Sequence, residues 1–238
     1  MSRHEGELRA HIATLLASHF PLAAERTRNA FTESFEVRKF RPREHLLAQD
    51  GDWDMELIIE GWVAVRRVGR TGRRFTIAVL GPGQLAGASA AARSPAHGEN
   101  VALTTVIAAI WPGSEVRRLV AADGGLALDF IDRIVLGIGT ILDRYDTVTF
   151  EGARARLCKV LLVYHDIAFG PRRPILSRGE LTSLVGSSRE MTNRILRQLE
   201  AEGAIRRIGG RGLELIDDTK LRHLPADEPR RGRRGAVV

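Results

Sequence analysis

The 238-residue sequence contains a single cysteine, Cys158. One thiol cannot form an internal disulfide framework, a four-cysteine zinc site or a cysteine-ligated iron–sulfur cluster. No apolar run approaches the roughly 18 residues that a membrane-spanning helix needs, and the first residues show no signal-peptide pattern. We therefore expect a cytoplasmic protein with no membrane partner, and predict neither a metal site nor a cofactor.

Lysine is also scarce, because only Lys39, Lys159 and Lys220 among the 36 basic residues are lysines. Arginine suits two-pronged contacts with phosphate and guanine, although a GC-rich genome would give the same bias. The excess positive charge lies in one part of the chain: residues 1–150 hold 18 basic and 18 acidic residues, whereas residues 151–238 hold 18 and 11. Residues 151–224 alone still hold 14 and 9, which suggests a polyanionic partner for this part.

Three patterns follow one another along the chain. Residues 8–32 predict one or two helices. Residues 35–112 form short alternating or apolar runs separated by glycines, which predicts a sandwich or barrel of short antiparallel strands. From about residue 115 the period becomes helical. We therefore predict an α+β protein with divisions at 1–122, 123–150 and 151–224, followed by a basic, disordered tail at 225–238.

The predicted helix at 123–150 has an apolar heptad pattern. Its members step alternately by three and four residues: Ile131, Ile134, Ile138, Ile141, Tyr145 and Val148. A spacing of about 3.5 residues per turn is typical of a helix that follows a partner helix. The pattern predicts a homodimer seam, and the alternative is that the stripe packs against the chain's own barrel.

The C-terminal part predicts a helix, a tight turn, a second helix and a hairpin. Ser177 and Glu180 form a capping box that starts the first helix, and Gly186 ends it. The sequence "SSREMTNRILRQLEAEG" predicts the second helix, and "AIRRIGGRGLELID" predicts a β-hairpin. This order is typical of a winged helix-turn-helix, whose second helix enters the major groove of DNA.

A helical wheel divides the second helix into a polar half and an apolar half. Arg189, Glu190 and Arg194 lie on the polar half, where arginine can contact guanine and glutamate can accept from cytosine. For Glu190 the alternative is a capping box with Ser187. We also predict contacts to DNA phosphates from a further set of residues: Ser188, Thr192, Asn193, Arg197, Arg206, Arg207 and Arg211.

Across residues 35–218 the chain resembles the Crp–Fnr family of bacterial transcription regulators. The match lies in "LTSLVGSSREMTNRILRQLEAEGAI" and in the barrel segments "GDWDMELIIEGWVAVRR" and "GRRFTIAVLGPGQLAG". The resemblance implies an N-terminal cyclic-nucleotide-binding β-barrel (a jelly roll), a dimerisation helix with a hinge at Phe150, and a winged helix-turn-helix. It also implies that Arg189, Glu190 and Arg194 read a GTGA-type half-site, and that RNA polymerase is a partner.

The sequence departs from the family where the nucleotide should bind. In "PGQLAGAS", Ala88 stands where the family has a carboxylate for the ribose hydroxyls, and residues 94–101 lack the arginine for the cyclic phosphate. Ile141 and Leu142 replace a polar pair that contacts adenine. We predict a degenerate pocket, formed by Gly83, Gly87, Ala88 and Ser89 with Ile141 and Leu142, that binds no cyclic AMP with high affinity. A remodelled pocket for another effector is the alternative.

Other functions receive less support from the residues. His97 could ligate haem only in principle and is interpreted as surface, while Cys158 is interpreted as core. The carboxylates Asp52, Asp54 and Glu56 are interpreted as turn and surface residues, and no nucleophile and base accompany them, so no enzyme is expected. A regulatory module that acts through protein contacts would bind DNA independently of Arg194.

Overall fold

The computed structural model describes residues 3–47, 54–92, 98–170, 174–209 and 212–222. The chain forms two compact units, Met1–Arg144 and Tyr145–Val238. The predicted tail at 225–238, together with Arg211, His97 and Asp52, lies outside the described residues. Within the described parts, no helix has both the length and the apolar character needed to cross a membrane.

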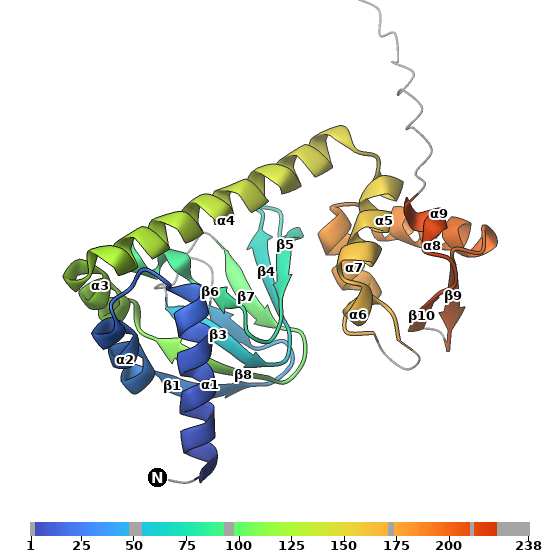
Figure 1. Ribbon diagram of the computed structural model, residues 1–238. Coiled ribbons are helices and arrows are strands. Elements are labelled where there is room, and N and C mark those ends of the chain that lie inside the picture. The colour runs from blue at the N-terminus through green and yellow to red at the C-terminus, as the bar shows by residue number, and fades with distance from the viewer. Residues whose placement is uncertain (1–2, 48–53, 93–97, 171–173, 210–211, 223–238) are drawn as a thin grey trace, which may run out of the picture. The chain divides into compact units, whose positions relative to one another are not determined.

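The N-terminal unit is built around two antiparallel four-stranded sheets (Figure 1). The first has the order β1-β8-β3-β6, formed by Glu36–Phe40, Val106–Trp111, Met55–Glu60 and Leu85–Ala86. The second has the order β2-β7-β4-β5, formed by His45–Leu47, Glu99–Ala102, Val63–Val68 and Arg74–Leu80. Side chains such as Ile58, Val63 and Ala108 fill the space between them. The predicted barrel of short strands is confirmed.

Helices cover the other face of the first sheet. They are α1 (Arg3–His19), α2 (Glu25–Ser34), α3 (Gly113–Ala122) and the start of α4 (Gly124–Phe150), with the short 3-10 helix η1 (Ala88–Ala91) beside α3. Their core includes a stack in which the ring of Phe20 lies 5.7 Å from Phe31 and 5.2 Å from Phe130. Met55, Leu57 and Trp111 join this core from the sheet. The first sheet therefore packs against other elements on both of its faces.

A break at Asp123 separates α3 from α4. The Asp123 carboxylate accepts hydrogen bonds from the backbone N–H groups of Gly125 and Leu126 at the start of α4, and from that of Ala24. Contact with the Thr27 hydroxyl and these amides lowers the pKa of Asp123 to about 2. A carboxylate at a helix N-terminus satisfies amides that have no partner within the helix. Asp123 therefore both ends α3 and starts α4.

The C-terminal unit begins with the last turn of α4. It continues with α5 (Ala153–Val163), α6 (His165–Ala168), α7 (Arg178–Val185), α8 (Arg189–Ala201), the hairpin of β9 (Ile205–Ile208) and β10 (Gly212–Leu215), and α9 (Thr219–Arg222). Helices α5 and α6 are separated at Tyr164, which is the C-cap of the first and the N-cap of the second. Helices α5, α7 and α8 pack together, and Cys158 is buried among them as expected.

Candidate nucleic-acid interface

Two serine caps and one glycine form the turn between α7 and α8. The Ser177 hydroxyl accepts from the Glu180 N–H at 3.2 Å, and Ser188 accepts from the Met191 N–H at 3.1 Å. Gly186 ends α7 with φ 65°, in the left-handed region where a side chain would be strained. The predicted start of α7 and its end at Gly186 are confirmed.

The two faces of α8 differ as the helical wheel predicts. Ile195, Leu196 and Leu199 are buried, and they lie in the same unit as the buried α7 residues Leu181 and Leu184. The opposite face is exposed and consists of charged and polar residues: Ser188, Arg189, Glu190, Arg194, Arg197 and Gln198. Hence the three residues expected to read bases lie together on one open face.

Glu190 does not close a capping box with Ser187. The N-cap residue of α8 is Ser188, and the Ser187 hydroxyl instead lies 2.8 Å from the Thr192 hydroxyl. Hydrogen bonds from its own backbone N–H and from Ser188, with Arg189 nearby, lower the pKa of Glu190. Glu190 therefore stays ionised at the exposed start of the helix, where a carboxylate also interacts favourably with the helix dipole.

Thr192 was predicted to contact phosphate, and this prediction is wrong. Its side chain is only 1% exposed. The hydroxyl donates to the Ser188 carbonyl at 3.0 Å and lies 3.3 Å from the Thr182 hydroxyl on α7. The wheel itself places Thr192 inside the apolar half, between Leu199 and Leu196, so its burial follows from its position on the helix. Thr192 therefore holds the turn together.

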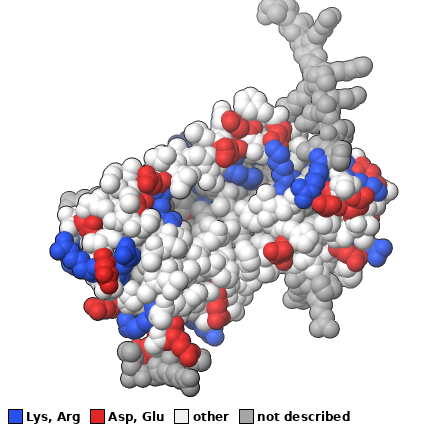
Figure 2. All heavy atoms as spheres, in the orientation of Figure 1, with Lys and Arg blue, Asp and Glu red and all other residues white. Residues whose placement is uncertain are grey.

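The other predicted phosphate contacts lie at or near the surface. Asn193 is half-buried, and its side-chain oxygen accepts from Arg178 at 3.2 Å. On the hairpin, Arg206 pairs with Glu214 at 3.2 Å, and Arg207 pairs with Glu200. Figure 2 likewise shows acidic side chains beside basic ones. Within the described residues, Arg194 and Arg197 have no acidic ion-pair partner, so these cations are fully available to a polyanion.

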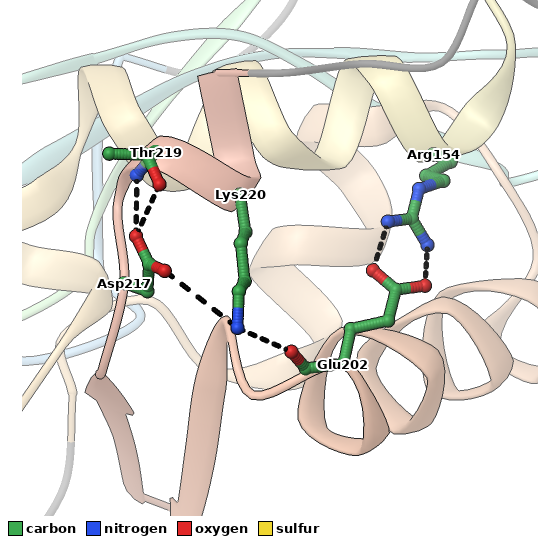
Figure 3. Close-up of polar contacts among 5 residues, drawn as sticks. All are labelled: Arg154, Glu202, Asp217, Thr219 and Lys220. Carbon is green, nitrogen blue, oxygen red and sulfur yellow. Dashed lines mark hydrogen bonds and ion pairs between the residues drawn. The ribbon is translucent and has the colours of Figure 1, made fainter.

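A group of ion pairs that the sequence pattern did not indicate fixes the far end of α8 (Figure 3). The Arg154 guanidinium on α5 makes two bonds to the Glu202 carboxylate, at 2.9 and 2.5 Å. Lys220 donates to the Glu202 backbone carbonyl at 2.9 Å and lies 3.7 Å from Asp217. Partners this distant in the sequence leave no local pattern. These contacts hold the C-terminal end of α8 against α5 and α9.

An open hollow of about 530 Å³ lies beside α8. Its lining combines the first residues of α5 with the exposed face of α8, including Arg154, Ser188, Met191, Arg194 and Gln198. The hollow shows that the exposed face of α8 is concave next to Arg194. A concave, arginine-lined surface suits a polyanionic ligand.

The loop of the predicted effector pocket contains two glycines in the left-handed region. Gly83 and Gly87 have φ 79° and 80°, and a Cβ at Gly87 would lie 2.1 Å from the Asp54 carbonyl oxygen. Ala88 and Ser89 follow at the start of η1 and are half-buried. The glycines are thus required by the fold itself. Ile141 and Leu142, the other predicted pocket residues, lie on α4 and are 54% and 57% exposed.

Glu56 was interpreted as a surface residue, but it is completely buried. Strand alternation places it on the same face of β3 as Ile58, between the two sheets. Asn100 donates to one carboxylate oxygen at 2.8 Å, and the other oxygen has no hydrogen-bond partner among the described residues. Burial, with Asp54 nearby, raises the pKa of Glu56 to about 7 despite the bond from Asn100. The acidic pattern of Asp52, Asp54 and Glu56 therefore gave no sign that Glu56 belongs to the core.

The heptad residues of α4 are exposed within this chain. Ile131, Ile138, Ile141 and Tyr145 are 51–63% exposed, and Ile134 and Val148 are 36–37% exposed. The helix face that does pack on the chain's own core contains Leu126, Asp129 and Phe130. The alternative that the stripe packs against the chain's own barrel is therefore wrong.

Comparison with known proteins supports both parts of this architecture. A cyclic nucleotide-binding domain model matches residues 37–123, and a Crp-like helix-turn-helix domain model matches residues 155–224. The cyclic AMP receptor protein of Thermus thermophilus is 27% identical over 183 residues, which cover 73% of this chain and 81% of that protein.

Solved structures share the fold at low sequence identity. FixK2 from Bradyrhizobium japonicum has a TM-score of 0.70 at 18% identity, covering 82% of this chain and 99% of that one. A Crp/Fnr-family transcriptional regulator from Thermus thermophilus has a TM-score of 0.65 at 21% identity, covering 79% and 96%. With two matched domains in the family's order and a helix-turn-helix that exposes its arginines, this chain belongs to the Crp–Fnr family of DNA-binding transcription regulators.

Proposed function

We propose that this regulator binds a palindromic DNA site with GTGA-like half-sites as a homodimer. The observation that supports this best is the exposed group of Arg189, Glu190 and Arg194 on a helix whose opposite face is buried. Two such helices, related by the symmetry of a dimer through α4, would lie about 34 Å apart, which is one turn of DNA. Residues 123–150 would then form the dimerisation helix, which lies in the sequence between the barrel and the winged helix-turn-helix. RNA polymerase is the partner, and the cytoplasm the compartment, that this role implies.

The Arg189→Ala variant tests the assignment of base contacts. Loss of a two-pronged arginine contact should weaken binding to a GTGA-type palindrome by about 1–3 kcal/mol, with little change on random DNA. Fluorescence anisotropy at one fixed salt concentration measures both affinities. Arg197→Ala is the matched control, because a phosphate contact should weaken both DNAs alike. Equal losses on both DNAs for Arg189→Ala would refute its role in base reading.

We propose further that cyclic AMP does not control the protein. Ala88 supplies no carboxylate, residues 94–101 contain no arginine, and Ile141 and Leu142 have no polar side-chain atoms. Loss of one charged partner alone costs a few kcal/mol of binding. Titration calorimetry with cyclic AMP should therefore show no heat, and the nucleotide should not change the affinity for the palindrome. Micromolar binding would contradict the proposal and favour a remodelled pocket.

A further inference from the structure

Arg156 on α5 joins three chain segments through its guanidinium group. Its Nε donates to the Val185 carbonyl at 2.8 Å, and its Nη1 donates to the carbonyls of Val148 at 3.1 Å and Glu151 at 2.7 Å. Val185 is the last residue of α7, next to the turn before the reading helix. Val148 belongs to the last turn of α4, and Glu151 directly follows that helix. One planar group therefore bonds the end of α4, the linker and the helix-turn-helix.

The partners of Arg156 are groups that need a donor. The last carbonyls of a helix accept no hydrogen bond from within that helix, and they form the negative end of its dipole. Arg156 meets this need for two helices at once, and the rigid fork of its guanidinium fixes their directions more closely than a flexible ammonium would. Glu151 is tied further, because its backbone N–H donates to Thr147 at 3.2 Å and its carboxylate pairs with Lys159. The two-residue linker between α4 and α5 is thus held on both sides.

We propose that Arg156 is a positioning residue that sets the distance between DNA half-sites which the dimer accepts. The inference rests on the proposed function, in which α4 forms the dimer seam and α8 reads each half-site. α4 runs from Gly124 to Phe150 without a break, so the direction of its last turn follows the seam. Arg156 transmits that direction to α7 and hence to α8. Without the guanidinium of Arg156, each helix-turn-helix keeps its base contacts but turns more freely about Glu151 and Gly152.

The test measures how strictly the protein selects half-site spacing. Wild type, Arg156→Lys and Arg154→Lys are titrated by fluorescence anisotropy onto the best palindrome and onto versions with one or two base pairs added or removed between the half-sites. Each added base pair turns one half-site by about 34° around the DNA axis. Wild type should lose about 100-fold in affinity when both half-sites can no longer be bound together. Arg156→Lys keeps the positive charge but not the planar guanidinium. Its loss of affinity on the palindromes with altered spacing should therefore be smaller, about tenfold.

Arg154→Lys is the matched control, because it removes an arginine fork on the same helix that joins α5 to Glu202 at the end of α8, rather than to α4. It should keep the spacing profile of wild type even if its affinity falls. Arg156→Gln provides a second variant should the lysine variant unfold, with circular dichroism as the check of folding. A merely stabilising role for Arg156 would lower affinity on all spacings equally, and that result would overturn the inference.

The outcomes also separate this inference from the proposed function. A wild-type protein that shows no preference for a palindrome over a single half-site refutes the dimeric function, and the inference with it. A sharp wild-type profile that Arg156→Lys shares refutes the inference alone.

Discussion

The two units place their charged groups in opposite ways. In the C-terminal unit, Arg189, Arg194 and Arg197 are exposed on α8, and a buried apolar face fixes their helix. In the N-terminal unit, a carboxyl group, Glu56, is buried between two sheets with one hydrogen-bond donor. In the proposed function, α8 presents the side chains that would contact DNA, whereas the barrel has an alanine at position 88 and no arginine in residues 94–101.

The difference shows that a pocket's backbone and its ligand contacts depend on different residues. Gly87 cannot change without a collision between a Cβ and the Asp54 carbonyl, so the barrel itself requires the loop's shape. Position 88, by contrast, already carries a side chain, and the resemblance to the family assigns the carboxylate at this position to the ligand. The shape of this loop therefore does not depend on a carboxylate at position 88. On α8, by contrast, the exposed side chains themselves are the interface.

The largest expected effect concerns α4. Replacing Ile138 by Asp would place an unpaired charge in the proposed dimer seam, which should weaken the dimer by about 4 kcal/mol, or roughly a thousandfold. Sedimentation equilibrium measures this, and specific DNA binding should fall with it. Thr140→Asp is the control, because Thr140 is exposed but lies off the heptad. A monomeric wild type, or an Ile138→Asp variant that still dimerises, would contradict the seam.

Much of this architecture follows from local patterns in the sequence. Alternation and regularly placed glycines predict the strands, and the wheel correctly separates Ile195 and Leu199 from Arg194. Contacts between distant segments could not be predicted in this way. The wheel places Thr192 in the apolar half, but its contacts with the hydroxyls of Thr182 and Ser187 depend on the packed fold. The bonds of Arg156 to three carbonyls depend on it as well. Glu56 looked like a surface residue because its neighbours Asp52 and Asp54 are also acidic.

The buried Glu56 should make the barrel less stable at high pH. Its pKa is about 7 when folded against an ordinary value of 4.5, so the folded state holds the proton more tightly. The stability that this gives is fully present below pH 4.5, and it is lost as pH rises through 7. Wild type should lose about 3 kcal/mol between pH 4.5 and 8 relative to Glu56→Gln.

Urea unfolding followed by tryptophan fluorescence suits this measurement. All three tryptophans, Trp53, Trp62 and Trp111, belong to the N-terminal unit, so the signal reports on the barrel. Glu60→Gln is the control, because Glu60 is exposed at the end of the same strand. Parallel pH curves for wild type and Glu56→Gln would mean that Glu56 is already neutralised or solvated, and would remove the contrast between the units.

A smaller effect is expected at Thr192, whose buried hydroxyl holds the turn between α7 and α8 together. Thr192→Val removes a buried hydroxyl that bonds Ser188 and contacts Thr182 and Ser187, at a cost of about 1–2 kcal/mol in stability. Hydrogen exchange of the α7 and α8 amides detects this loss, and Thr192→Ser, which keeps the hydroxyl, should show less of it. If Thr192 contacted a phosphate instead, Thr192→Val would lower the DNA affinity and reduce the slope of log K against log salt. Hydrogen exchange of the α7 and α8 amides would then not change.

The smallest effect is expected on the hairpin, where arginines already have acidic partners. To contact a phosphate, Arg206 must exchange Glu214 for it, and both side chains are well exposed, at 65% and 44%. Arg206→Ala should lower the slope of log K against log salt by about 0.9 if the contact forms. Glu214→Gln makes the opposite change, because it frees Arg206, and should raise affinity slightly without altering the preference for the palindrome. Unchanged slopes in both variants would restrict DNA binding to the cations of α8. Among the described residues, Arg194 and Arg197 on that helix have no acidic ion-pair partner to give up.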